Sequence, residues 1–328
     1  MSLPLGPVCD SGKANLSRFA YSLLASALHF TFIIPSYNGA SKLPTTLDTL
    51  FAFQTDPAFL EALVVVDGST DPTMAVLNGY STLPLHTVVQ QNQGRSSARN
   101  TGIAAAKGTH FFFLDDDIRV SDSCLTLHFQ HHRDFPNSIL VGNVLMDPTR
   151  LKKDFEVYLA HLFEKWNKNR PTKTQVFPSD FIFTTQNVSM PREVTEAIGN
   201  FDIRLTDAED YDFGMRALEM EIPIYYDPAA LAWHDDFPTC VRYIKRQVEY
   251  KRAHVRLKEL GKKYLVDHFV PLTAPKATWK LLLLRMFSHA LWVKGIDNQA
   301  FRFLPRKIRF KLYAVIVYSH TLKELGLI

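Results

Sequence analysis

Short apolar runs alternate with helical patterns over roughly the first 120 residues of the chain. The apolar runs are continuous and rich in β-branched and aromatic residues, which is typical of strands buried on both faces of a parallel sheet. The pattern therefore predicts an α/β fold in which helices flank a mostly parallel sheet. The predicted strands are 30–35, 62–67, 85–90 and 109–114, and the predicted helices are 43–54, 73–80 and 96–107.

The middle of the chain is less regular, and its last part is helical. Residues 164–175 are polar and predict a loop, while 181–184 and 224–226 resemble strands on either side of a predicted helix around 210–219. A helical pattern dominates 240–260, and the final fifty residues predict two or three amphipathic or apolar helices.

Polar clusters follow three of the four predicted strands, at 35–38, 67–71 and 115–117. Open parallel sheets bind ligands in the crevice beyond the carboxyl ends of their strands. The third cluster, Asp115-Asp116-Asp117, is electrostatically costly because adjacent carboxylates repel and lose hydration near a core. A divalent cation carrying phosphate groups would turn that cost into a binding site. The alternative is an acidic turn that caps the next helix.

Several functional classes lack their sequence signatures. The turn after the first predicted strand has no G-x-G-x-x-G fingerprint, and no G-x-x-x-x-G-K-[ST] phosphate loop occurs. A nucleotidyltransferase would need a glycine-rich loop with Lys or Arg after that strand, which residues 35–38 do not provide. Cys9, Cys124 and Cys240 have no metal-type spacing, so unpaired thiols in a reducing compartment are expected.

Charge is distributed unevenly along a chain whose overall apolar and charged content, 46% and 21%, is that of an ordinary globular protein. Residues 241–328 hold 19 Lys and Arg against 5 Asp and Glu, whereas residues 1–240 hold 18 against 28. A basic C-terminal quarter suggests an anionic partner, for which a membrane surface, a nucleic acid and a phosphorylated substrate are candidates. A solvated helical face rich in Lys and Arg is the alternative.

The N-terminus imitates a signal peptide, because Lys13 and Arg18 precede an apolar run. We expect no export, since that run continues into the predicted core strand 30–35. Apolar residues 281–293 are interrupted by Arg285 and His289, so an interfacial helix is more compatible with them than a spanning one. The expectation is a cytoplasmic protein, with peripheral association with the inner face of the membrane left open.

An ordered series of motifs covers about residues 30–235. The motifs are IIPSYN at 33–38, VVDGSTD at 65–71, NQGRSSARNTG at 92–102, FLDDD at 113–117, IGNFD at 198–202, Glu209-Asp210, and Tyr226-Asp227-Pro228 through His234. In this order they resemble the family 2 inverting glycosyltransferases, which are nucleotide-diphospho-sugar transferases with the GT-A fold. The resemblance implies a Rossmann-like, mostly parallel sheet and transfer of a sugar from a nucleotide-diphosphate sugar, with UDP-sugars expected, to an acceptor hydroxyl.

The resemblance also implies a divalent metal, Mn²⁺ or Mg²⁺, on the departing diphosphate. Asp115 and Asp117 match the D-x-D motif of the family, and Asp117 is the expected direct ligand. Asp115 or Asp116 would face ribose or metal-bound water, and three consecutive Asp leave the frame open. His234 matches a family position that completes the metal shell, although a lone His is often structural.

Nucleotide-sugar contacts are implied at the first loops. Asp67 resembles the carboxylate that hydrogen-bonds the nucleobase, with an Asx turn as the alternative. Pro35, Tyr37 and Asn38 match the loop that frames the base. Gly94 permits a close backbone approach, and Arg95 is a nucleotide candidate.

Glu209-Asp210 matches the Glu-Asp pair of the family. An inverting single displacement needs a base to take the acceptor proton, and by resemblance Asp210 is that base while Glu209 holds the acceptor or orients Asp210. Arg99 and Asn100 lie inside a predicted helix and are expected to be structural. His131-His132 look like surface residues.

The resemblance divides the chain into an N-terminal extension at 1–28, a GT-A catalytic domain at 29–238 and a basic helical region at 239–328. The catalytic domain would comprise a nucleotide-binding half at 29–120 and an acceptor half at 121–238. No Gln-x-x-Arg-Trp motif follows His234, which favours a non-processive enzyme.

The expected partners are the nucleotide-sugar donor, a carbohydrate or lipid-linked acceptor and an anionic membrane surface, with no nucleic acid. Membrane contact is expected from 279–293 and 301–317, although packing of these helices on the catalytic domain is an open alternative. A catalytically silent nucleotide-sugar-binding or membrane-associated scaffold of the same fold is the competing function.

Overall fold

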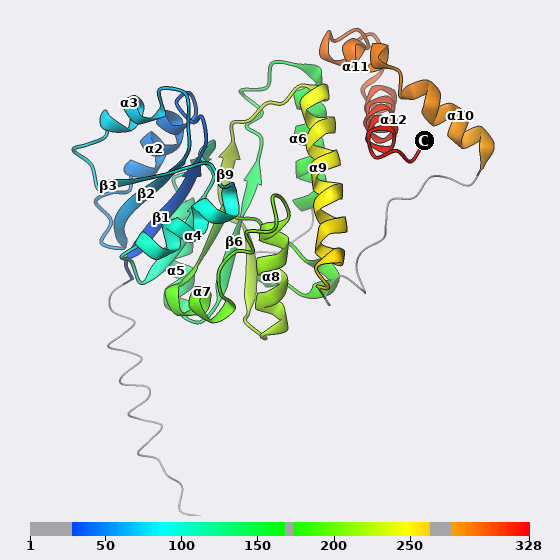
Figure 1. Cartoon of the computed structure of the whole chain (residues 1–328). Helices are drawn as coiled ribbons and strands as arrows, with labels where there is room; N and C mark the ends of the chain where they lie inside the picture. Colours follow the sequence, from blue (N-terminus) through cyan, green and yellow to red (C-terminus); the bar gives the residue numbers. More distant parts are fainter. Residues whose placement is uncertain (1–27, 168–172, 263–276) are drawn as a thin grey trace, which may run out of the picture.

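A computed structural model describes residues 28–167, 173–262 and 277–328, so most of the predicted N-terminal extension lies outside the described residues. One sheet with helices on both faces forms the body, and a helical group stands beside it (Figure 1). The strands are β1 Phe30–Ser36, β2 Phe59–Asp67, β3 Leu85–Gln90, β4 His110–Leu114, β5 Ile118–Val120, β6 Ile139–Leu145, β7 Thr174–Gln175, β8 Asn187–Pro191 and β9 Ile224–His234. The helices are α2 Leu43–Phe51, α3 Thr73–Asn78, α4 Arg95–Ala105, α5 Cys124–Asp134, α6 Asp154–Asn167, α7 Arg192–Ile198, α8 Glu209–Glu219, α9 Cys240–Glu259, α10 Thr278–Phe287, α11 Ala290–Asp297 and α12 Arg306–Glu324.

The sheet has nine strands in the order β3-β2-β1-β4-β8-β6-β9-β5, with β7 paired to β9. Strands β1 to β4 are parallel to one another, and β8 runs antiparallel between β4 and β6. The carboxyl ends of β1, β2 and β4 therefore meet at one edge, as the predicted polar clusters require. The predicted α/β fold with a largely parallel sheet is confirmed.

Alternate side chains of the parallel strands enter two separate cores. Phe32 and Ile34 of β1 belong to the core that α2 and α5 cover, whereas Ile33 belongs to the core on the α4, α7 and α8 face. Because β1, β2 and β4 are buried on both faces, their sequences are largely apolar, whereas β3 at the edge of the sheet is partly exposed. This explains why β1, β2 and β4 were predictable.

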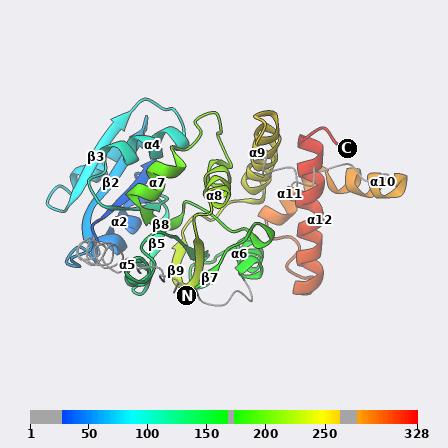
Figure 2. The ribbon, with the colours of Figure 1, turned by 90° about the horizontal axis from the view of Figure 1, so that it is seen from below.

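The C-terminal helices pack through a third core. Side chains of α6 and α9, such as Tyr158 and Ile244, contact Val293 of α11 and Tyr313 and Ile316 of α12. In Figure 2, α9, α11 and α12 follow one another outward from the sheet, and α10 lies outermost. The predicted helical C-terminal region is present in the described part, and α11 and α12 pack on the sheet-bearing body. Among the described residues no helix is both long and apolar enough to cross a membrane.

Two local predictions are wrong. Of the loop predicted at 164–175, residues 164–167 belong to α6 and Thr174–Gln175 form the short strand β7, while 168–172 lie outside the described residues. Residues 181–184 form no strand, and the segment that pairs with Tyr225 and Tyr226 of β9 is β7. Phe181 and Phe183 instead pack over Gly214 of α8, which fills the core without a ladder.

Candidate active site

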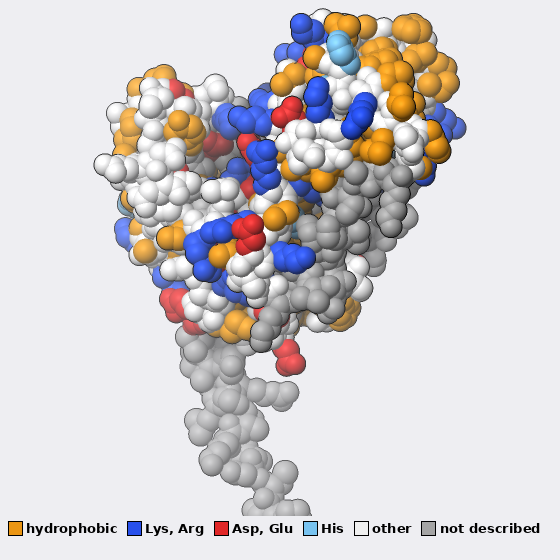
Figure 3. Space-filling view, turned by 45° about the vertical axis from the view of Figure 1, so that its right-hand side comes forward, with side chains coloured by type: hydrophobic (Ala, Val, Ile, Leu, Met, Phe, Trp, Pro, Cys, Tyr) orange, Lys and Arg blue, Asp and Glu red, His pale blue; other side chains and the backbone are white. Residues whose placement is uncertain are grey.

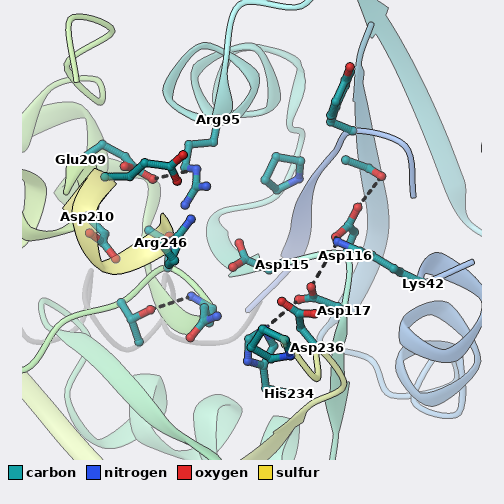
Figure 4. A pocket seen from close by; sticks show the side chains of 18 of the residues that line it. Lys42, Arg95, Asp115, Asp116, Asp117, Glu209, Asp210, His234, Asp236 and Arg246 are labelled. Carbon is teal, nitrogen blue, oxygen red and sulfur yellow. Dashed lines mark hydrogen bonds and ion pairs between the residues drawn. The ribbon is translucent and has the colours of Figure 1, made fainter. Parts of the chain in front are cut away.

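A cavity of about 760 Å³ opens at the carboxyl ends of β1, β2 and β4. Helices α4, α8 and α9 and the end of β9 close its other sides (Figure 4). Pockets of this size suit a nucleotide-sized ligand. Every residue that the sequence singled out for the site lines the cavity except Asn38, namely Pro35, Tyr37, Asp67, Gly94, Arg95, Asp115, Asp116, Asp117, Glu209, Asp210 and His234.

Asp117, His234 and Asp236 form a cluster with one ligand atom each, all within 4.8 Å of one another. The antiparallel pairing of Ile118 with His234 brings these residues together, and the Asp235 amide donates to the Asp117 carbonyl at 2.9 Å. Nε2 of His234 lies 3.4 Å from Oδ1 of Asp117. Burial opposes the charged forms of both groups, but their mutual hydrogen bond and attraction dominate, which lowers the pKa of Asp117 and raises the pKa of His234. The cluster is a candidate cation site with oxygen and nitrogen donors.

Asp116 is turned away from that cluster. Its Oδ2 accepts from the Ser36 hydroxyl at 2.7 Å, and its Oδ1 lies 3.3 Å from Nζ of Lys42, which also reaches Asp117. Burial raises the pKa of Asp116 to about 6, partly offset by Lys42. The Asp116 side chain therefore fastens the end of β4 to β1 and to Lys42.

Asp115 belongs to a different network, because its carboxylate lies against α4. Nη2 of Arg99 lies 3.0 Å from Oδ1 of Asp115, and Nη1 donates to Oε1 of Glu209 at 2.5 Å. Both Arg99 and Glu209 are buried. One guanidinium thus joins the acidic cluster after β4 to the Glu-Asp pair on α8.

Asp210 follows Glu209 at the start of α8 and lines the cavity. Its burial, and secondly the charge of Glu209, raises its pKa to about 7 despite the opposing charge of Arg99. Ala208, directly before this pair, has a φ of +62°, a left-handed conformation that is unfavourable for a residue other than glycine. The backbone strain therefore lies where Glu209 and Asp210 enter the cavity.

Asp67 fixes the loop between β3 and α4. It accepts from the amides of Gln93 at 2.9 Å and Gly94 at 2.8 Å, and from Nε2 of Gln90 at 2.7 Å. Gly94 has a φ of +86°, which a side chain would disfavour. These bonds give Asp67 a structural role, while its place in the cavity wall leaves the expected contact with a nucleobase as a prediction.

Residues at the end of β1 differ in their surroundings. Tyr37 is 51% exposed at the cavity rim, available to stack with a ligand. Asn38 does not line the cavity, and its Oδ1 accepts from the Thr70 amide at 2.8 Å. Asn38 therefore holds the loop after β2 in place.

The wall formed by α6 and α9 combines basic and apolar side chains. Arg246 of α9 lies 3.5 Å from Asp207, which also lies 3.7 Å from Arg95. Arg242 and Lys245 of the same helix line the cavity beside it. The apolar members of this wall are Leu159, Leu162 and Phe163 of α6, Tyr243 of α9, and Met146, which follows β6.

Several of these residues were not predicted from the sequence as site residues, among them Asp236, Lys42, Arg246 and Arg99. Asp236 stands two positions after His234, but Asp235 offered the same carboxylate and instead pairs with Arg119. Lys42 and Arg246 belong to no motif, and Arg99 was expected to be structural. The roles of Lys42, Arg99 and Arg246 depend on which way α2, α4 and α9 face, which the sequence pattern does not specify.

Comparison with known proteins supports the resemblance. A family model, "Glycosyl transferase family 2", matches residues 31–199. A PGL/p-HBAD biosynthesis glycosyltransferase of Mycobacterium tuberculosis is 28% identical over 192 residues, 57% of this chain and 68% of the relative. A dolichyl-phosphate beta-glucosyltransferase of Drosophila melanogaster is 34% identical over 102 residues, 28% of this chain and 31% of the relative.

Solved structures share the fold. The mannosyltransferase of Pyrobaculum calidifontis, in complex with GDP-Man and Mn²⁺, has a TM-score of 0.57 at 17% identity, covering 95% of this chain and 96% of that one. Residues 1–349 of S. aureus TarS, in complex with UDP-GlcNAc, have a TM-score of 0.51 at 15% identity, covering 91% and 92%. Since the family model spans more than half of the chain, this protein belongs to glycosyl transferase family 2 and is a nucleotide-sugar glycosyltransferase.

Proposed function

We propose that the chain transfers a sugar from a nucleoside-diphosphate sugar to an acceptor hydroxyl with inversion, in one displacement and with Mn²⁺ or Mg²⁺ bound. The proposal rests on one observation. Asp117, His234 and Asp236 line one side of the cavity, and Asp210 lines the other (Figure 4). An inverting displacement needs stabilisation of the leaving group and a base on opposite sides of the reacting carbon.

The donor set of the cluster fits a divalent cation of the Mn²⁺ or Mg²⁺ type. Two carboxylates and one imidazole, with no thiolate, suit such ions. When bound, the ion would neutralise the charge that develops on the departing diphosphate. His234 would have to give up the proton that it shares with Asp117 before its Nε2 could serve as a ligand.

Asp210 is proposed to accept the proton of the acceptor hydroxyl. The acceptor oxygen forms a bond to the anomeric carbon while the bond to the diphosphate oxygen breaks, and the leaving diphosphate keeps the electron pair. A pKa of about 7 suits a base that works near neutral pH. Glu209 is held by Arg99 at 2.5 Å, so we assign it to positioning rather than to proton transfer.

The donor is proposed to be a UDP-sugar, with Asp67, Tyr37 and Pro35 around the base and Arg95 near the phosphates. Support comes from the fold neighbours, which were solved with UDP-GlcNAc or GDP-Man. A screen of both nucleotide classes would identify the base.

The acceptor is proposed to be lipid-linked. The wall of Met146, Leu159, Leu162, Phe163 and Tyr243 offers apolar contacts beside the basic Arg242 and Lys245. An acceptor with an apolar chain and a phosphate near the reacting hydroxyl would match both the apolar and the basic side chains of this wall.

Nucleotide release and donor binding test the assignments separately. Asp210→Asn should bind donor normally but lose transfer by at least about a thousandfold, because its amide accepts no proton. Asp117→Ala should lose Mn²⁺-dependent donor binding in calorimetry. Asp122→Ala, an exposed carboxylate nearby, and Glu219→Gln, at the far end of α8, are matched controls.

Three results would contradict the proposal. Full turnover by Asp210→Asn would exclude it as the base. Retention of anomeric configuration in the product, measured by NMR, would exclude a single displacement. Absence of nucleotide release with every donor and Mn²⁺ would favour the silent scaffold.

A further inference from the structure

The helix α10 presents an apolar face to solvent. Trp279, Leu282, Leu283 and Met286 follow the i, i+3, i+4, i+7 spacing of one helical face and are 66%, 70%, 42% and 51% exposed. Leu284 is the only buried residue of this helix. In an amphipathic helix of a globular body such a face normally points into the core, so here the usual orientation is reversed.

Neighbouring segments extend this surface. Leu291 at the start of α11 is 68% exposed, and Phe303, between α11 and α12, is 80% exposed. Phe303, Leu282 and Leu291 are the three most exposed large apolar side chains of the described chain. Figure 3 shows apolar side chains gathered over these helices at the upper right. We call Trp279, Leu282, Leu283, Met286, Leu291 and Phe303 the C-terminal apolar face. Scattered apolar residues are normal on a surface, whereas gathered ones mark a contact site.

Basic side chains border the C-terminal apolar face. Helical geometry places Lys280 and Arg285 on either side of the apolar stripe of α10. Lys280 also lies over the ring of Trp279, with Nζ 5.5 Å from its centroid. Arg302, Arg306 and Lys307 surround Phe303 in the sequence and are exposed. Figure 3 shows Lys and Arg side chains among and around the apolar ones. The partner of this surface should therefore be both apolar and anionic.

The other side of these helices is fixed to the body. Tyr313 of α12 donates to Oδ2 of Asp154 at 2.7 Å, and Nη2 of Arg309 lies 2.7 Å from Oδ1 of the same carboxylate. Val293 and Ile296 of α11 are buried against α6 and α9. The apolar face is thus held outward by a packed core.

A bilayer surface matches these properties. A helix of ten residues is about 15 Å long, half the thickness of a hydrocarbon core, so α10 can lie in a membrane interface but cannot span it. Apolar side chains would enter the acyl boundary while Lys and Arg contact anionic head groups. A second protein of generic composition would not require this excess of positive charge.

We propose that the C-terminal apolar face and its basic border dock this enzyme onto an anionic phospholipid bilayer. This surface lies outside the catalytic cavity, since none of its residues lines it. The inference goes beyond the proposed transfer reaction, and binding can be measured without turnover. Failure of docking would therefore leave the catalytic assignments intact, and failure of catalysis would leave docking intact.

Vesicle co-sedimentation of the full chain tests the proposal. Vesicles of phosphatidylcholine with about 30 mol% phosphatidylglycerol should bind the protein at least about tenfold more strongly than phosphatidylcholine alone. Binding should weaken as NaCl rises above physiological ionic strength. Tryptophan fluorescence should shift to shorter wavelength on binding, and Trp279→Phe should remove most of that shift.

Two variant pairs separate the apolar and basic contributions. Leu282→Glu with Phe303→Glu, and separately Arg302→Glu with Lys307→Glu, should each lower vesicle partitioning at least about tenfold. Ile203→Glu, at a side chain 66% exposed on the sheet-bearing body, and Arg133→Glu, exposed on α5, are the matched controls and should bind as the parent does. Circular dichroism shows whether each variant remains folded.

Other outcomes would overturn the proposal. Equal binding to neutral and anionic vesicles would remove the role of the basic border. Unchanged binding by both variant pairs would place membrane contact elsewhere. A dimer in lipid-free solution that dissociates with Leu282→Glu would show that a second copy of the chain covers this face instead.

Discussion

Arg99 neutralises two carboxylates that belong to different parts of the site. It lies 2.5 Å from Glu209, which is next to the proposed base, and 3.0 Å from Asp115, which follows β4. Removing one partner of a buried ion pair typically costs about 3–5 kcal/mol, because the remaining charge stays desolvated. Arg99→Met should therefore destabilise the fold by about that amount in urea denaturation and lower transfer at least about tenfold.

A double variant distinguishes pairing from packing at this position. Arg99→Met combined with Glu209→Gln should recover part of the lost stability, since no unpaired charge then remains at residue 209. Arg256→Met, in an exposed pair with Glu259, should cost less than about 1 kcal/mol and serves as the control. Equal losses of stability in Arg99→Met and Arg256→Met would show that the buried ion pair stabilises the fold no more than an exposed one.

Asp210 should set the acid limb of the pH–rate profile. Its pKa is raised to about 7 by burial and Glu209, and only the ionised form can accept a proton. The turnover rate should therefore fall tenfold per pH unit below about pH 7, measured at saturating donor and metal. A profile flat down to pH 5 would contradict this assignment.

The same carboxylate predicts a change in stability with a definite sign. Because the folded-state pKa of Asp210 is above the unfolded value of 3.8, ionising it destabilises the native state as pH rises between about 4 and 7. Asp210→Asn lacks this charge. Its melting temperature should exceed that of the parent by a few degrees at pH 8 and match it near pH 4.

Motif residues of the site were predictable because their chemistry depends on residue type and on strand ends. Asp117, Asp210 and His234 came from the order of short motifs, and the cavity contains all three. Asp236 and Lys42 were not predictable, because each acts through a side-chain direction set by packing. Lys42 reaches Asp116 and Asp117 only because α2 packs against β5, which directly follows these two carboxylates.

At the scale of elements, α5 carries three histidines into the core rather than onto the surface. The surface prediction for His131 and His132 is wrong, since both are buried, as is His128. Ser189 of β8 lies 2.7 Å from Nδ1 of His128 and from Nε2 of His132. Sequence favoured exposure because histidine is polar, but each buried ring has one nitrogen within hydrogen-bond distance of the Ser189 or Ser138 hydroxyl.

This arrangement predicts lability to acid. Burial lowers the pKa of His128 to about 3 and of His131 to about 4, and lowers the pKa of His132 well below 6.5. The unfolded chain binds these protons near pH 6.5. The contribution of the three histidines to the free energy of unfolding is therefore full above that pH and declines as pH falls toward 4. His132→Gln, whose amide can still meet Ser189, should flatten the decline in melting temperature over this interval.

The control for α5 is His161→Gln, a solvent-exposed histidine of α6. It should leave the pH dependence of the melting temperature unchanged. An equal effect of both substitutions would show that carboxylates elsewhere, rather than buried histidines, govern the acid transition.

Helices and strands were predictable where the local hydrophobic pattern determines the element. They were misassigned where packing against neighbouring elements determines it. Strands buried on both faces need only a largely apolar run, so β1, β2 and β4 could be placed within a few residues. Residues 181–184 have a similar composition but form no strand, and Phe181 and Phe183 pack over Gly214 of α8 instead. Pairing partners are a property of the sheet, which a local pattern does not contain.

At the scale of the whole molecule, α11 and α12 are packed on the sheet-bearing body. Polar contacts of Asp154 lie within the third core that joins them to it. The buried carboxylate of Asp154 in α6 accepts hydrogen bonds from the hydroxyl of Tyr313 and the guanidinium of Arg309. The division of the chain at residue 238 remains a prediction, but the packing of α12 on α6 and α9 indicates cooperative unfolding across that boundary.

Asp154→Ala should uncouple the C-terminal helices from the body. Loss of the carboxylate leaves Arg309 as a partly buried charge and Tyr313 as a buried hydroxyl without this acceptor, at a cost of about 3 kcal/mol or more. Hydrogen exchange should accelerate in α11 and α12 while β1 to β4 stay protected, because the two sheet cores do not include Asp154. Asp134→Ala, which removes only the exposed contacts with Lys173 and Gln130, should change neither region. Uniform acceleration across sheet and helices in Asp154→Ala would instead mean that the chain unfolds as one unit, with the third core as essential to it as the sheet.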